Sequence, residues 1–119
     1  MAWEVVFYSL PSGQQPVLGW LQEQAPAVRA AFAHIFDLLE DQGTGVGMSH
    51  VKPLGRKLYE LRVRDQGNSY LTLYFAAFGQ RFVMLHAFHK KTQKTPKQDL
   101  GKALKRMDDF LSSDTPPVP

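Results

Sequence analysis

Basic side chains gather in one short segment of this chain, the run His89-Lys90-Lys91-Thr92-Gln93-Lys94-Thr95-Pro96. The run follows an apolar stretch with strand character and precedes a predicted helix, whose first backbone N–H groups favour an anion. Its lysines add positive charge, and its Thr and Gln side chains add neutral donors. This combination is suited to binding a phosphodiester. A solvated basic turn without any ligand is the alternative, because a run of lysines alone is weak evidence.

A second group of charged residues lies on a predicted strand from Lys57 to Arg64. Glu60, Arg62 and Arg64 alternate with apolar residues and would therefore share one face of this strand. An ordinary solvent-facing strand is the alternative interpretation. If the sheet brings this face beside the lysine run, two segments that are distant in the sequence form one basic surface.

Two histidines belong to the strand that leads into the lysine run. His86 lies among apolar residues, and we expect it to be a core histidine rather than a catalyst. His89 lies at the end of the strand beside the lysines. It is the better candidate for an ionisable group at a site.

The charge of the chain is strongly segregated. Thirteen of the fourteen Lys and Arg residues lie between Lys52 and Arg106, whereas the segments before and after this range are net acidic. The formal net charge of +3 therefore conceals a basic C-terminal half. Clustered positive potential attracts polyanions by releasing their counterions, so nucleic acid or an acidic protein is the expected partner.

Length and composition limit the remaining possibilities. The 119 residues have room for a single domain, which we expect over residues 1–111, followed by a flexible tail over 112–119. No apolar run reaches the roughly 18 residues of a membrane span, and the N-terminus lacks the pattern of a signal peptide. The chain has no Cys, which fits a reducing cytoplasm, and its four His make a metal site improbable. We therefore expect a cytoplasmic protein that needs no metal and no small-molecule cofactor.

The elements that must position the charged residues follow from periodicity and from turn residues. In chain order they are a strand at Val5–Tyr8, a helix at Gln15–Gln24, a helix from Pro26 to Gly43, strands at Lys57–Arg64, Ser69–Phe78 and Arg81–His89, and a helix to about Leu111 that is capped by Thr95. The glycine-rich segment Gly43–Gly47 is expected to be a flexible connector. The three consecutive strands predict an antiparallel meander, and the whole order, β-α-α-β-β-β-α, predicts one α+β domain.

Four segments of the chain resemble the phage-derived HigB-like branch of the RelE/ParE toxin superfamily. They are Val51-Lys52-Pro53-Leu54-Gly55, Leu58-Tyr59-Glu60-Leu61-Arg62, Leu73-Tyr74-Phe75 and the stretch from Leu85 to Pro96. The resemblance runs from near Met1 to about Leu111. It implies a RelE-like fold, in which an antiparallel sheet carries an N-terminal helical hairpin and a C-terminal helix. It also implies a toxin of a type II toxin–antitoxin pair that cleaves mRNA on the ribosome and is neutralised by a helix-turn-helix antitoxin.

The resemblance also implies a metal-independent reaction, in which a ribose 2′-OH attacks the adjacent phosphorus and leaves a 2′,3′-cyclic phosphate. The catalytic candidates are Glu60, Arg62, Lys90, Lys91 and Lys94. The RNA-binding candidates are Lys57, Arg64, His89, Thr92, Gln93 and Lys97. Either Glu60 or a lysine of lowered pKa is expected to act as the base, and His89 is a candidate acid.

One position departs from the family pattern. Members commonly have Arg directly after the Tyr of the middle strand, whereas Tyr70 is followed here by Leu71. The loss of this guanidinium implies reduced cleavage, or compensation by Arg62 or Arg64. Two other functions therefore stay open: a ParE-like toxin that acts on DNA gyrase without nuclease chemistry, and a cleavage-impaired homologue that only binds its antitoxin.

Overall fold

A computed structural model describes residues 3–46, 50–91 and 94–113 of the chain. Its elements are β1 (Glu4–Phe7), α1 (Pro16–Gln22), α2 (Pro26–Gln42), a 3-10 turn η1 (Gly43–Gly45), β2 (Val51–Gly55), β3 (Leu58–Asp65), β4 (Asn68–Ala77), β5 (Arg81–Lys90) and α3 (Lys97–Ser113). The α+β class and the predicted order of elements are confirmed, with one strand added. No helix within these ranges combines the length and the hydropathy that crossing a membrane requires.

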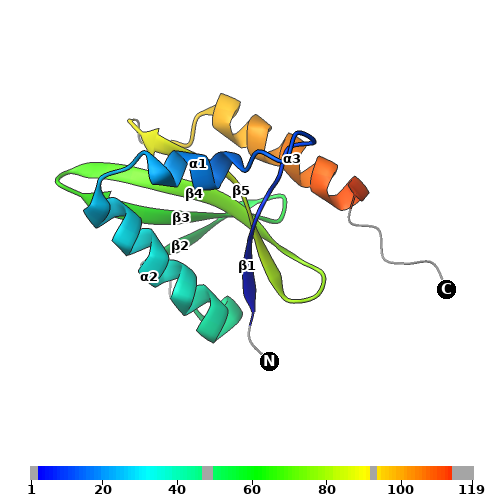
Figure 1. Cartoon of the computed structure of the whole chain (residues 1–119), viewed down its shortest axis with the longest axis horizontal. Coiled ribbons are helices and arrows are strands. Elements are labelled where there is room, and N and C mark those ends of the chain that lie inside the picture. The colour runs from blue at the N-terminus through cyan, green and yellow to red at the C-terminus, as the bar shows by residue number, and fades with distance from the viewer. Residues whose placement is uncertain (1–2, 47–49, 92–93, 114–119) are drawn as a thin grey trace.

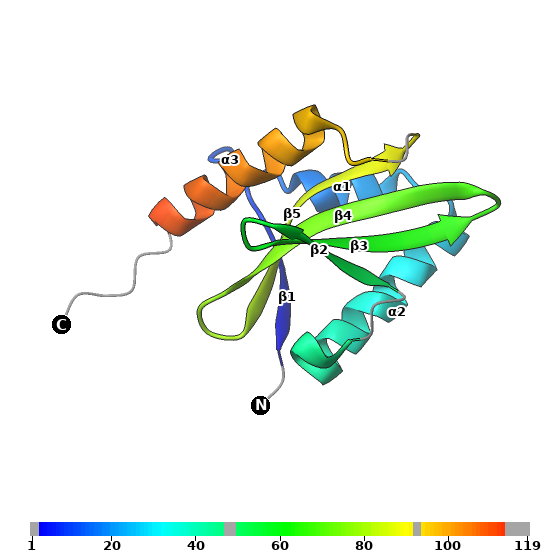
Figure 2. The same ribbon diagram turned by 180° about the vertical axis from the view of Figure 1, so that it is seen from behind.

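The five strands form one sheet in the order β1-β5-β4-β3-β2, with α1 and α2 on one face and α3 on the other (Figures 1 and 2). Strands β2 to β5 are an antiparallel meander. The first strand adds to the free edge of β5 and runs parallel to it, with Val5 opposite Phe82. As predicted, β5 therefore lies inside the sheet and has a neighbour on both sides.

The added strand is β2, which the sequence did not predict. It contains Pro53 and Gly55, two residues that weaken a strand assignment. Its position explains why they are tolerated: β2 is the outer strand of the sheet, and its ladder with β3 shifts register between these two residues. Because Lys52 pairs with Glu60, the added strand brings a further cation beside the charged side of β3.

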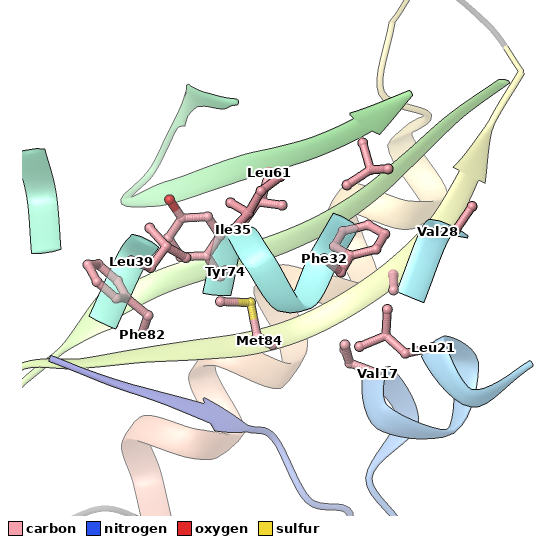
Figure 3. Packing of buried hydrophobic residues seen from close by; sticks show 12 residues of the cluster. Val17, Leu21, Val28, Phe32, Ile35, Leu39, Leu61, Tyr74, Phe82 and Met84 are labelled. Atoms are coloured by element: carbon pink, nitrogen blue, oxygen red, sulfur yellow. The ribbon is translucent and has the colours of Figure 1, made fainter. Parts of the chain in front are cut away.

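The larger core fills the space between the sheet and the two N-terminal helices (Figure 3). Its buried members are Val17, Leu21, Val28, Phe32, Ile35, Leu39, Leu61, Val63, Tyr74, Phe82, Met84 and Ala87. The second helix ends as predicted at Gly43, which has a φ of 60°. A Cβ atom at this position would collide with the indole ring of Trp3, which stacks on Phe82 with ring centroids 4.4 Å apart. Only glycine fits this helix end.

A bulge in β5 decides which of its side chains face α3. The ladder with β4 shifts register between Leu73 and Tyr74, which leaves Leu85 as the extra residue of β5. A bulge reverses the alternation of side chains beyond it. Leu85 packs in the cluster beneath α3, and His86 on the far side of the bulge also contacts that helix. Lys90 consequently faces the α3 side as well.

Candidate active site

Glu60 and Arg62 form an ion pair on the α3 side of β3. Nη2 of Arg62 donates to Oε2 of Glu60 over 2.6 Å. The Glu60 side chain is only 1% exposed, whereas the Arg62 side chain keeps 27% of its surface accessible. This part of β3 is therefore not an ordinary solvent-facing strand. A buried carboxylate is tolerated only when it is paired and hydrogen-bonded, and its accessible partner is thereby held in a defined position.

Thr95 provides the second hydrogen bond to this carboxylate. Its hydroxyl group donates to Oε1 of Glu60 over 3.1 Å. We expected Thr95 to cap the last helix with Pro96 as the first helical residue, but α3 begins at Lys97. The chain before α3 instead folds back over β3, and this contact fixes the start of the helix against the sheet.

Charged side chains line up across three strands on this face. The register places Glu60 opposite Leu73 and His86, Arg62 opposite Leu71 and Phe88, and Arg64 opposite Ser69 and Lys90. Arg64 and Lys90 thus lie in one row with a single strand between them, which corresponds to about 10 Å. The fold brings together the two segments that we predicted would form one basic surface. We call Glu60, Arg62, Arg64 and Lys90 the cation cluster.

The surroundings of Lys90 lower its pKa below the ordinary value for lysine. Burial is the main cause, and the positive charges of Arg62, Lys52 and Arg64 act in the same direction. The negative charge of Glu60 opposes them. An amine that is less firmly protonated is better able to accept a proton from a hydroxyl group at moderate pH. The cation cluster therefore contains a candidate base beside a guanidinium that can bind an anion.

The other residues of the lysine run surround the start of α3. Lys91 directly follows β5, Lys94 directly precedes Thr95, and Lys97 is the first residue of the helix. All three are exposed. Thr92 and Gln93, two of the predicted RNA-binding residues, lie outside the described residues. Among the described residues of the run, Thr95 contacts the cation cluster through its hydrogen bond to Glu60.

Two predicted site residues lie away from this cluster. Lys57 occupies the turn at the opposite end of β3, about 23 Å along the strand from Arg64. His89 faces the α1 and α2 side, where it stacks on Tyr70 with ring centroids 4.8 Å apart. Its Nε2 lies 3.2 Å from Oδ1 of Asn68. His89 is adjacent to Lys90 in sequence but points to the other face of the sheet.

His86 is buried, as expected, but it has charged partners that the sequence analysis missed. Its Nε2 lies 2.6 Å from Oδ1 of Asp99, and its Nδ1 lies 3.4 Å from Nη1 of Arg106. The same Arg106 atom donates to the carbonyl oxygen of Leu85 over 2.9 Å. Burial lowers the pKa of His86, although Asp99 partly opposes this effect. The spacing of seven residues between Asp99 and Arg106 puts both on one helix face and was the available signal.

Leu71, the position at which the chain departs from the family pattern, is fully buried. It is 0% exposed and packs in the cluster between the sheet and α3. Leu71 is therefore part of the core and does not open onto the basic surface.

The described residues contain no group of three or more His, Asp or Glu side chains that is arranged to hold a metal ion.

Comparisons with known proteins point to the same family as the sequence motifs. A family described as "Phage derived protein Gp49-like (DUF891)" matches residues 19–108. Two curated relatives, each named "Probable endoribonuclease HigB1", come from Mycobacterium tuberculosis strains CDC 1551 / Oshkosh and ATCC 25618 / H37Rv. Each is 32% identical to this chain over 105 residues, which cover 76% of this chain and 83% of the relative. The family match includes the whole of β2 to β5 and most of α3, and so contains the cation cluster.

Proposed function

The chain belongs to the Gp49-like family of phage-derived proteins, in the HigB-like branch of the RelE/ParE superfamily, and on this premise we propose that it is an endoribonuclease toxin. We propose further that it cuts mRNA on the ribosome in the cytoplasm and is neutralised by a helix-turn-helix antitoxin. The observation that carries this proposal is the ion pair between the buried Glu60 and the accessible Arg62, beside Lys90, a lysine of lowered pKa. The names of the two relatives support the same class of reaction.

In the proposed reaction, a ribose 2′-oxygen attacks the adjacent phosphorus and the bond from phosphorus to the 5′-oxygen breaks. The products are a 2′,3′-cyclic phosphate and a 5′-hydroxyl end. Lys90, in its neutral form, accepts the proton of the 2′-hydroxyl group. Arg62 stabilises the negative charge that develops on the phosphorane oxygens. The departing 5′-oxygen takes a proton from a neighbouring ammonium group, which we assign to Lys91.

Glu60 then has a positioning role rather than the role of the base. Its carboxylate is buried and already accepts hydrogen bonds from Arg62 and Thr95. A general base has to reach the proton that it removes, and Glu60 has almost no accessible surface. Of the two bases that the sequence left open, the geometry favours Lys90. Glu60 holds the guanidinium of Arg62 in the orientation that phosphate binding requires.

Although Leu71 stands where relatives carry an arginine, a guanidinium is still present on this face of the sheet, on Arg62. Arg62 is the cross-strand partner of Leu71, so its accessible side chain starts from the neighbouring strand on the same side. A planar guanidinium can donate two parallel hydrogen bonds to a phosphate, which a lysine cannot do. This register supports compensation by Arg62 for the arginine that relatives carry after the tyrosine.

Induced expression tests the proposal directly. We expect wild-type protein to arrest growth and to cut a reporter mRNA, with the cut sites mapped by primer extension. Lys91→Ala and the double variant Glu60→Gln/Arg62→Ala should each relieve growth arrest without unfolding the protein. Lys91 is exposed, and such changes alter stability by about 0.5 kcal/mol. Glu60 is neutralised together with Arg62 because Arg62→Ala alone would leave a buried carboxylate without its ion-pair partner, at a cost of about 3–5 kcal/mol. Arg29→Ala removes an exposed cation from α2 and serves as the matched control. Full toxicity in both site variants would remove them from the active site.

The same experiment separates the two alternative functions. Growth arrest with intact mRNA and trapped gyrase–DNA complexes would identify a ParE-like toxin. Normal growth, together with retained binding to an antitoxin encoded beside this gene, would identify a homologue that has lost cleavage. Purified protein tested on reporter mRNA with and without ribosomes then decides whether cleavage depends on the ribosome.

A further inference from the structure

Phe78 is an unusually exposed aromatic residue. It is 86% exposed, more than any other large apolar side chain among the described residues. It begins the three-residue turn between β4 and β5 and belongs to neither of the two cores. Water is an unfavourable environment for an aromatic ring of this size, so an exposed ring that the fold keeps in place is a candidate for contact with a partner.

The turn that carries Phe78 is held in place. Nε and Nη2 of Arg81 both donate to the carbonyl oxygen of Phe78, over 2.9 and 2.6 Å. The guanidinium of Arg81 also lies 5.4 Å from the ring centroid of Phe110 in α3. The aromatic ring is thus presented on an ordered turn, and less conformational entropy is lost when a ligand stacks on it.

The neighbouring turn between β2 and β3 carries two cations in a strained conformation. Arg56 has a φ of 54° and Lys57 a φ of 71°. Two-residue turns with both φ values positive strongly prefer Asn-Gly, because other side chains are crowded there. The chain keeps two exposed cations where a neutral pair would be more stable. Strain that persists in this way is typical of functional positions.

Both turns lie at one end of the sheet, away from the cation cluster (Figures 1 and 2). The ladder between β3 and β4 ends at Tyr59 opposite Tyr74, so the β2–β3 turn is beside the last residues of β4. The opposite end of the same ladder carries Arg64. Along β3, Lys57 is about 10 Å from the buried Glu60, about 17 Å from Arg62 and about 23 Å from Arg64. We call Arg56, Lys57 and Phe78 the distal surface.

We propose that the distal surface is a second binding site for single-stranded RNA, in which the ring of Phe78 stacks on an unpaired base while Arg56 and Lys57 contact the flanking phosphates. Aromatic stacking combined with backbone cations is the chemistry by which proteins bind single strands without reading their sequence. The inference rests on the proposed function in taking RNA as the substrate. It extends that function by giving the RNA a second contact, away from Arg62 and Lys90. In this contact Lys57 binds a phosphate of the RNA.

The test measures RNA binding separately from cleavage. The probe is a labelled 2′-O-methyl RNA of about 16 nucleotides, a length that spans one single-strand site. This RNA lacks the 2′-hydroxyl nucleophile, so fluorescence anisotropy reports binding alone. We expect Phe78→Ala to weaken binding by about five- to 150-fold, and Phe78→Trp to retain it. Leu111→Ala, which truncates a side chain that is 51% exposed on α3, is the matched apolar control and should have no effect.

The double variant Arg56→Asn/Lys57→Gly separates binding from folding. It installs the residues that this turn prefers, so its Tm should rise while its RNA affinity falls. Log K, with K the association constant, falls linearly with the logarithm of the salt concentration. Loss of two phosphate contacts should make this slope shallower by about 1.4. Arg29→Gln, which removes an exposed cation from α2, should leave both the affinity and the slope unchanged.

Each outcome decides the matter. If either Phe78→Ala or Arg56→Asn/Lys57→Gly binds the probe within twofold of wild type, or if wild type does not bind it at all, the RNA site that we propose is not present at the distal surface. If both variants lose binding while wild type cuts no mRNA in cells, the RNA site stands and the proposed nuclease function fails. If both lose binding and wild type cuts mRNA, both proposals stand.

Discussion

Arg62 and Leu71 are cross-strand partners on the α3 face of the sheet, yet one keeps an accessible guanidinium and the other is fully buried. Their side chains start from neighbouring strands, and the difference arises because Leu71 lies on a central strand beneath α3. In the proposed function, Arg62 on β3 therefore takes the anion-binding role that the family resemblance would assign to an arginine on β4. This relationship makes position 71 a test of packing rather than of catalysis.

We expect Leu71→Arg to destabilise the protein without raising mRNA cleavage. The change buries a charge where an apolar side chain packs, and a loss of about 3–5 kcal/mol in the free energy of unfolding is expected. Leu71→Met keeps the volume and should lose less than about 1.5 kcal/mol. Urea unfolding measured beside ribosome-dependent cleavage checks both parts. A stable Leu71→Arg protein with faster cleavage would show that this position does open onto the active site.

The pH dependence of cleavage should follow the protonation of Lys90. Because the neutral amine is the active form, the rate should rise with pH, and the midpoint of this rise should lie below the ordinary lysine pKa of 10.5. Arg62→Gln removes a charge that lowers this pKa, so the rise should shift to higher pH. Glu60→Gln removes a charge that raises it, so the rise should shift to lower pH. Cleavage rates measured as a function of pH give both shifts. Equal midpoints of the pH profile in all three proteins would exclude Lys90 as the base.

The stability of the fold should fall in mild acid because of His86. Its pKa in the folded protein lies below the ordinary value of 6.5, so the folded state favours the neutral ring. The contribution of the neutral ring to the free energy of unfolding is fully present above pH 6.5 and is lost as the pH falls below that value. His86→Gln should therefore lose less stability on acidification than wild type, whereas His34→Gln, at an exposed position of α2, should behave like wild type. Urea unfolding at about pH 8 and about pH 5 checks this, and equal losses in all three proteins would contradict it.

Binding to the antitoxin should depend on salt if an acidic segment of that partner covers the cation cluster. Interactions between accessible charges are screened beyond about 8–10 Å at physiological ionic strength. We therefore expect affinity to fall as salt rises, mainly through slower association. Calorimetric titrations at low and high salt measure the effect. An affinity that salt does not change would mean that apolar contacts, rather than charge, hold the antitoxin.

Local physical chemistry in the sequence was sufficient for every helix and strand except β2, and for most of their ends. Pro26 and Gly43 bound the second helix as predicted, because proline suits a first helical turn and glycine alone tolerates the backbone at this helix end. The alternation of Glu60 with Leu61 predicted the two faces of β3, since successive side chains of a strand point to opposite sides. The segregation of charge likewise identified the basic half of the chain.

Only the tertiary structure decided how these pieces meet. β5 is apolar on both faces, so no alternation in its sequence reveals the bulge at Leu85 that turns Lys90 toward Arg64 and leaves His89 on the other face. The burial of Glu60 depends on Thr95, which is 35 residues away and returns over β3 only because α3 packs on that face. Periodicity reports the local direction of a side chain. Register and the covering element determine its neighbours, and these depend on contacts between segments that are distant in the sequence.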